Sequence, residues 1–175
     1  MRVTELLTNE NITFAVVDTA QIRFDPMFRE LCQKNTCGFY GACWTCPPDA
    51  GTIEELMEQA KRHTHTLVFQ TVHPLEDSFD IEGMHEASVK HNRLVQAVNS
   101  AARAEYPGCL VLGAGTCGVC ARCTKPDGDP CRFPEKAVVS LEACGIDVAQ
   151  LAKAAGLKYI NGVNTVTYFG AVLYD

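Results

Sequence analysis

The sequence lacks several features that would place it in a familiar class of protein. None of its apolar runs approaches the length of a membrane span, and residues 1–11 contain no apolar stretch typical of a secretory signal. No basic run offsets the net charge of −6, which argues against a nucleic-acid partner. There is no glycine-rich nucleotide motif, no Ser/His/Asp set and no internal repeat. We therefore expect a cytoplasmic protein with neither a membrane nor a nucleic acid as its partner.

Cysteine, by contrast, is abundant, with ten residues in a chain of 175. Thiols stay reduced in the cytoplasm, and clustered cysteines there bind metal more often than they form disulfides. A secreted disulfide scaffold is disfavoured because no signal is present and because the hydrophobic content of 47% allows a large core. The length predicts a single domain over residues 1–175, with cysteine loops at 32–51 and 115–134.

Four of the cysteines fall in one run whose spacing is typical of a cluster site. The run reads C-x2-C-x2-C-x7-C, and its last gap holds a Pro/Gly turn. Three thiolates spaced by two residues can surround one corner of a cubane, and a fourth after a turn can close the far corner. A zinc site usually takes two separated C-x2-C pairs, which would leave the middle cysteine unused. We interpret the run as a [4Fe-4S] site with the ligands Cys117, Cys120, Cys123 and Cys131.

A second group of four cysteines lies nearer the N-terminus and ends at the dipeptide Pro47-Pro48. It permits three interpretations: a second [4Fe-4S] cluster with four thiolates, a cluster with three thiolates and an open iron, or one zinc or cluster shared with the other run. Two metal sites explain more of the cysteines than one. A closed cluster suits electron transfer, whereas an open iron can bind a substrate. The candidate ligands are Cys32, Cys37, Cys43 and Cys46, of which Cys43, beside Trp44, is the weakest.

These motifs resemble those of a family of small, cysteine-rich bacterial and archaeal proteins, described as predicted metal-binding proteins of unknown function. The resemblance spans most of the chain and implies metal binding, without a substrate or a reaction. It implies that the position of Cys43 is not fixed as cysteine, and so favours a three-thiolate site at Cys32, Cys37 and Cys46. The matching segments are Cys32, Cys37-Gly-Phe-Tyr40-Gly41, Trp44-Thr-Cys46-Pro47-Pro48, the run Cys117/Cys120/Cys123, Pro130-Cys131-Arg132-Phe-Pro134, and Ser140-Leu-Glu142-Ala-Cys-Gly145-Ile146-Asp147-Val148.

Hydrophobic periodicity predicts strands that alternate with helices. The expected class is α+β with an α/β-like alternation: a single mixed β-sheet covered by helices, from which the two cysteine loops project. Thr52 and Glu55 have the spacing of a helix-capping box. Strands are expected at 12–17, 66–72, 109–114 and 165–174, and helices at 25–32, 52–62, 82–105, 140–143 and 148–155.

Several other side chains have expected roles. His91 lies on the apolar stripe of the longest helix, where a hydrogen-bonded core residue is expected rather than a ligand. Tyr40 and Trp44 are expected to shield the first site from water. Cationic groups near a cluster stabilise its negative charge, and three of them flank the second run, although a solvated loop would look the same: Arg122, Lys125 and Arg132.

The leading hypothesis is an iron–sulfur protein that binds two [4Fe-4S] clusters and works in electron transfer or cluster-based redox chemistry in an anaerobic or microaerobic cell. A redox partner protein is expected, together with a homodimeric state. With an open iron at the first cluster, the protein would be an enzyme. The alternatives are a structural or regulatory zinc protein, with Cys43-x2-Cys46 and Cys117-x2-Cys120 around one ion, and a metallochaperone.

Overall fold

Two ten-residue strands, β2 (His65–Pro74) and β5 (Thr165–Tyr174), pair along their whole length at the centre of a five-stranded sheet. This arrangement comes from a computed structural model that describes residues 1–175. The strand order is β1-β2-β5-β3-β4, with β1 at Thr13–Asp18, β3 at Leu110–Gly113 and β4 at Val139–Ser140. All pairings are antiparallel except that of β3 with β4. The predicted α+β fold with a single mixed sheet is confirmed.

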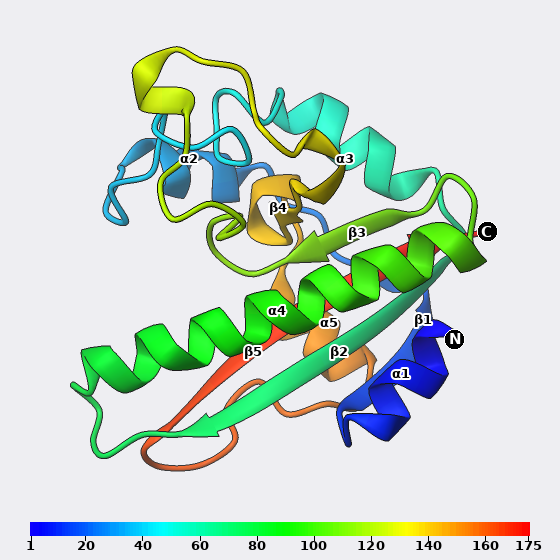
Figure 1. Cartoon of the computed structure of the whole chain (residues 1–175). Coiled ribbons are helices and arrows are strands. Elements are labelled where there is room, and N and C mark those ends of the chain that lie inside the picture. The colour runs from blue at the N-terminus through cyan, green and yellow to red at the C-terminus, as the bar shows by residue number, and fades with distance from the viewer.

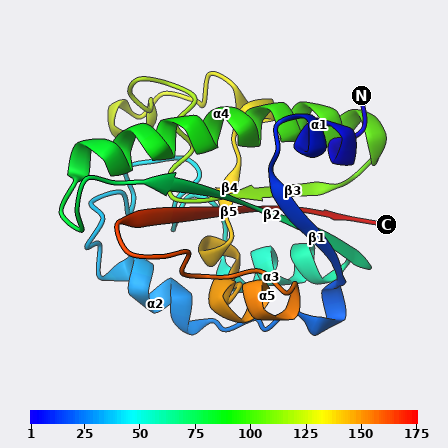
Figure 2. The same ribbon diagram turned by 90° about the horizontal axis from the view of Figure 1, so that it is seen from below.

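Helices cover both faces of this sheet (Figure 2). The first helix, α1 (Val3–Asn9), and the longest, α4 (Ile81–Glu105), lie on one face. The other face carries α2 (Met27–Gln33), α3 (Ile53–Lys61) and α5 (Val148–Ala154). No helix combines the length and the apolar character needed to cross a bilayer. Four short 3-10 turns complete the chain, at Thr19–Gln21 (η1), Lys125–Asp127 (η2), Pro134–Lys136 (η3) and Glu142–Cys144 (η4).

The alternation of side chains along the strands produces one core on each face. In β2, Leu67 and Phe69 belong to the core under α1 and α4, whereas Val68 between them belongs to the core under α3 and α5. The period of two residues is that of a pleated strand. Because both faces of β2 are covered, residues 66–71 are all buried, including the polar residues Thr66, Gln70 and Thr71.

The helices that the sequence predicted most strongly form as expected. The capping box of α3 is present: the Glu55 N–H donates to Thr52 Oγ1 at 3.2 Å, and the Thr52 N–H donates to the Glu55 carboxylate at 3.0 Å. On α4 the buried side chains include His91, as the apolar stripe predicted. One His91 ring nitrogen lies 2.9 Å from Thr71 Oγ1 and the other 3.2 Å from the Phe169 carbonyl, so this histidine is a core residue.

Hydrophobic periodicity did not predict helix α1 or strand β4. Helix α1 has only seven residues, too few to show a repeating stripe, and it is held by tertiary contacts. Its Val3 and Leu7 are fully buried, and the Val3 N–H donates to the carboxylate of Glu105 at 2.7 Å. Strand β4 has only two residues, and η4, predicted as a helix over 140–143, is a single 3-10 turn.

Both cysteine loops lie at the same end of the molecule (Figure 1). The first loop follows α2 and leads into α3, and the second leaves the end of β3 and returns to β4. In Figure 1 they stand side by side above β3, far from α1. Residues about eighty positions apart in sequence are thereby brought into contact.

Candidate metal centre

The first loop carries its thiols at different depths. Cys32 is half-buried in the last turn of α2, Cys37 is exposed, Cys43 is buried at 5% exposure and Cys46 is half-buried. The backbone folds back on itself between them: the Cys46 N–H donates to the Cys43 carbonyl at 3.0 Å, and the Gly41 N–H donates to the Pro47 carbonyl at 2.9 Å. Gly41 has a φ of 69°, a left-handed conformation that glycine adopts without strain.

The second loop holds its four cysteines, all of them half-buried, in one continuous stretch after β3. The buried Thr124 organises its distal turn. Its hydroxyl donates to the Pro130 carbonyl at 3.0 Å, and its own carbonyl accepts from the Asp129 N–H at 3.3 Å. These bonds close the turn that separates Cys123 from Cys131.

A clasp of side chains joins the two loops. The Trp44 indole N–H lies 3.2 Å from both Thr124 Oγ1 and the Asp129 carbonyl. The Lys125 ammonium forms an ion pair with Asp49 and lies 4.5 Å from the centre of the Trp44 ring, a cation–π arrangement. Trp44 was expected only as a shield, but in the structure it is the main bridge between the loops. We call Trp44, Asp49, Thr124 and Lys125 the clasp.

Cys43 lies at the contact between the loops. Its sulfur lies 3.4 Å from the Thr45 hydroxyl, and the Cys46 thiol and the Cys117 backbone are near enough to favour its thiolate form. These donors, with Cys46 first, lower the pKa of Cys43 to about 4 against the opposing effect of burial. The pKa of Cys46 is raised because its proton is held in the bond to Cys43 and because it is buried.

Charge on neighbouring thiols opposes further ionisation. Burial raises the pKa of Cys32, and negative charge on Cys37 raises it further. The pKa of Cys117 is likewise raised by burial first, with smaller contributions from Cys43 and Cys131. Several thiolates can therefore form together here only if positive charge enters, as a metal centre would provide.

The structure also places an unpartnered cation beside Cys32. Arg29 precedes Cys32 by one helical turn of α2, and its charge acts to lower the pKa of that thiol. Its Nη1 donates to the Gly51 carbonyl at 2.9 Å, but its buried Nε and Nη2 have no hydrogen-bond partner. A buried guanidinium with free donors is suited to an anionic group. A cluster held by thiolates is such a group, so the donor set fits it.

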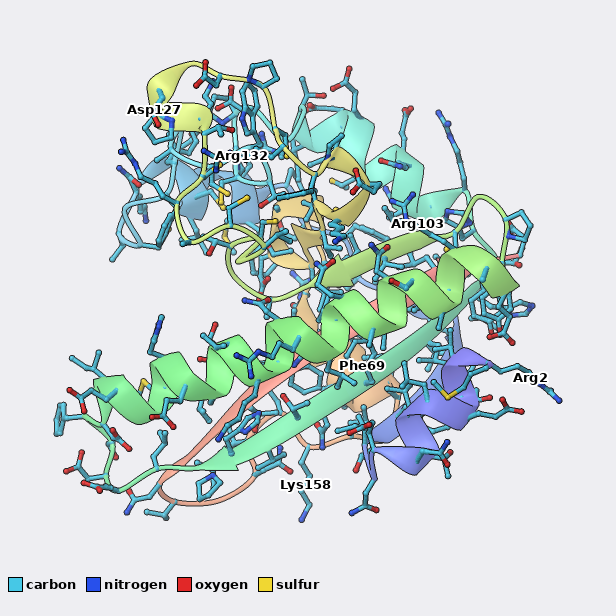
Figure 3. The ribbon with its side chains drawn as sticks, in the orientation of Figure 1. Arg2, Phe69, Arg103, Asp127, Arg132 and Lys158 are labelled. Atoms are coloured by element: carbon cyan, nitrogen blue, oxygen red, sulfur yellow. The ribbon has the colours of Figure 1, made fainter.

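The cations expected around the second loop are already engaged with protein groups. Arg122 pairs with Asp127 at 2.8 Å, and Arg132 donates to the Arg122 carbonyl at 3.2 Å. Figure 3 shows sulfur atoms gathered beneath the loop that carries Asp127 and Arg132. Arg29, which the sequence analysis did not single out, is the better candidate for a cation that stabilises the charge of a cluster. Its i, i+3 spacing to Cys32 on a helix was the sequence signal that could have indicated this role.

The thiols are free and do not already surround one point. All ten cysteines are unpaired, which agrees with a metal-binding role for the loops. No group of three or more Cys, His, Asp or Glu side chains is placed to hold a metal ion, so binding requires the loop thiols to turn toward a shared centre. The remaining two cysteines are structural: Cys144 is fully buried in the core, and Cys109 packs beside the other core.

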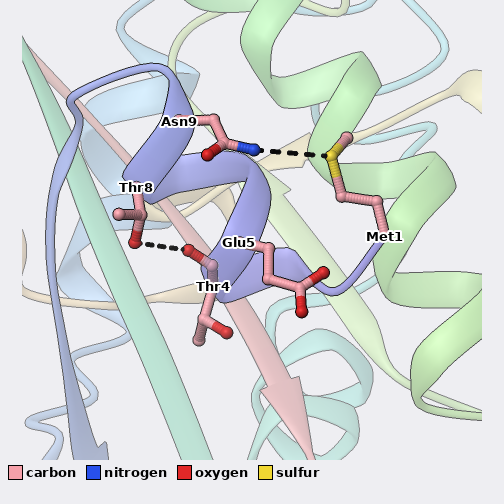
Figure 4. Close-up of a pocket in the computed structure, with 5 residues that line it drawn as sticks. All are labelled: Met1, Thr4, Glu5, Thr8 and Asn9. Carbon is pink, nitrogen blue, oxygen red and sulfur yellow. Dashed lines mark hydrogen bonds between the residues drawn. The ribbon is translucent and has the colours of Figure 1, made fainter.

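A wide surface hollow elsewhere in the molecule offers no comparable chemistry (Figure 4). It lies on α1 and has a volume of about 530 Å³. The Thr8 hydroxyl there donates to the Thr4 carbonyl at 2.8 Å, so this polar group is already satisfied within the helix. The hollow is lined by Met1, Thr4, Glu5, Thr8 and Asn9.

The fold and the two cysteine loops define a metal-binding α+β protein. A family model described as "Predicted metal-binding protein (DUF2284)" matches residues 15–174, which is almost the whole chain. The chain therefore belongs to this family, and the resemblance seen in its cysteine motifs is confirmed. The family description gives metal binding but neither the metal nor a reaction. No curated protein and no solved structure matches the chain.

Proposed function

We propose that this protein carries electrons on two [4Fe-4S] clusters, one held by each cysteine loop. The second loop supplies Cys117, Cys120, Cys123 and Cys131, and the first supplies Cys32, Cys37 and Cys46. Such clusters supply one-electron redox chemistry when bound. The proposal includes a protein redox partner and a cytoplasmic location, where thiols remain reduced.

The observation that carries the proposal is the gathering of eight thiols on two clasped loops beside a buried, unpartnered guanidinium. The clasp keeps the loops together, and electron exchange between two centres needs such proximity. Arg29 has two N–H groups without a protein partner, and an anionic cluster beside Cys32 would satisfy them. Hydrogen bonds to cluster sulfurs raise the reduction potential, which gives Arg29 a role as a positioning residue.

One contact favours a second candidate, a single zinc site shared between the loops. Cys43 and Cys117 are near enough to shift one another's pKa, so the C-x2-C pairs of the two loops approach one another. Two such pairs are the usual donors of a structural zinc ion. This candidate uses Cys43, Cys46, Cys117 and Cys120 and leaves Cys123 and Cys131 without a role.

Single substitutions followed by metal analysis distinguish the candidates. Under the two-cluster proposal, Cys123→Ala and Cys46→Ala each lose about half of the iron and labile sulfide, because each loop holds one cluster. Cys43→Ser keeps the full iron and labile-sulfide content if the first cluster has three thiolate ligands. Cys109→Ala is the matched control. A zinc content that is unchanged in Cys123→Ala but lost in Cys43→Ser would overturn the proposal in favour of the shared zinc site.

A further inference from the structure

A small cavity opens where β3 and β5 separate, next to the start of the second cysteine loop. Its volume is about 220 Å³, below the range of roughly 300–1,000 Å³ typical of pockets for drug-sized ligands. The lining is mostly apolar and aromatic, with one carboxyl group. The residues that matter for its chemistry are Gly115, Glu142, Tyr159, Thr167, Tyr168 and Phe169.

The cavity follows from the sheet topology. Strand β3 pairs with β5 only at residues 171–173, after which the chain leaves the sheet toward Cys117. Residues 165–170 of β5 therefore have no strand on that side. The open edge of a sheet beside a diverging strand is a common place for a ligand, because loops from two elements converge there.

Glu142 supplies the only carboxyl group of the cavity lining. It lies on η4, which packs between α2 and α3. None of the ion pairs of the protein involves Glu142. Burial raises its pKa, hydrogen bonding to its own backbone N–H and to the Ser140 side chain opposes this in part, and no cationic side chain contributes. A half-buried carboxyl without a cation is costly when ionised, and a cationic ligand would supply the missing charge.

The lining of the cavity also includes three aromatic residues, Tyr159, Tyr168 and Phe169. Tyr159 stacks on Phe169, with ring centres 5.9 Å apart and an interplanar angle of 16°. The segment that carries Tyr159 is tied to β5 because the Asn161 amide donates to Thr167 Oγ1 at 3.0 Å. The Tyr168 hydroxyl donates to the Met84 carbonyl at 3.1 Å and is therefore satisfied. Flat aromatic faces beside a carboxyl group suit an organic cation.

We propose that this cavity binds a small organic cation, an amine on a short aromatic or apolar group, with the ammonium at Glu142 and the apolar part against Tyr159 and Phe169. The site does not depend on which metal the cysteine loops hold. Its ligand chemistry rests on the combination of a small volume, a carboxyl group without a cationic partner and aromatic residues in the lining.

The test uses 2-phenylethylammonium as the probe, with 2-phenylethanol and phenylacetate as neutral and anionic controls of the same shape. Titration calorimetry on the full metal-loaded chain should give a dissociation constant for the ammonium at least about tenfold below those of both controls, since a charge-assisted bond is gained. Glu142→Gln should remove this preference, whereas Glu135→Gln, at an exposed position, should leave it unchanged.

Tyr159→Ala provides a second variant in case Glu142→Gln fails to fold, because Tyr159 is 52% exposed and lies at the rim. It should weaken binding of the ammonium several-fold through lost ring contact. Equal affinity for the three probes, or no saturable binding of the ammonium up to about 10 mM, would overturn the proposal. So would an unchanged preference in a folded Glu142→Gln variant.

Discussion

The clasp between the cysteine loops makes a quantitative prediction for Trp44→Phe. The substitution keeps an aromatic ring under Lys125 but removes the indole N–H that faces Thr124 and the Asp129 carbonyl. A neutral hydrogen bond contributes about 1 kcal/mol net. Loss of both contacts should therefore make separation of the loops easier by about 1–2 kcal/mol, a factor of roughly five to thirty.

Hydrogen exchange read by mass spectrometry measures this opening directly. The informative amide is that of Cys117, which lies near Cys43 at the contact between the loops. Peptides that cover residues 116–133 should exchange roughly five to thirty times faster in Trp44→Phe if local opening limits exchange. The matched control is Tyr106→Phe, in the core on the α4 side of the sheet, which should leave these peptides unchanged. Unchanged protection in the Trp44 variant would refute the clasp.

Three further results are expected. Gly145→Ala should lower the free energy of urea unfolding by about 1–3 kcal/mol, because φ is 72° and the new Cβ would lie 3.1 Å from Met57 Cγ. Gly156→Ala, with φ of 68° and open space, should cost less, and equal losses would contradict the packing argument. Burial lowers the pKa of His91 to about 4 from 6.5. The stability that neutral His91 gives the fold is therefore complete above pH 6.5 and is lost as the pH falls toward 4. Between these two pH values, the advantage of the wild-type chain over His91→Gln in free energy of unfolding should shrink by roughly 3 kcal/mol. A constant advantage in urea titrations across that range would refute this. Cys144 is fully buried with a pKa raised to about 12, so iodoacetamide at about pH 8 should alkylate loop thiols of the metal-free chain and spare Cys144. Modification of Cys144 at a similar rate, located by peptide mapping, would contradict that placement.

The parts of the fold that the sequence predicted are those with a repeating physical signal. The buried stripe of α4 and the capping box at Thr52 and Glu55 were recognisable because their spacing is fixed by the helix itself. Helix α1 was missed because its seven residues are stabilised by distant groups such as Glu105. Tertiary contacts of this kind leave no local pattern.

The candidate metal centre likewise has features that the sequence predicted and features that it did not. Cysteine spacing identified both loops, but the contact between them depends on Trp44 meeting a turn eighty residues later. The expected cations Arg122 and Lys125 are engaged with carboxylates, and the unpartnered guanidinium belongs to Arg29 on α2. In the sequence, Glu142 stood out only as a member of the segment 140–148 that resembles the family. Its isolation from any cation depends on how η4 packs, which the sequence does not encode locally.

The measurement that tests the central claim most directly is the metal and sulfide content of protein purified without oxygen. Two [4Fe-4S] clusters predict about eight irons and about eight acid-labile sulfides per chain, with an EPR signal after dithionite reduction that reports any coupling between them. Zinc without labile sulfide would contradict the redox account and leave a zinc site shared between the clasped loops.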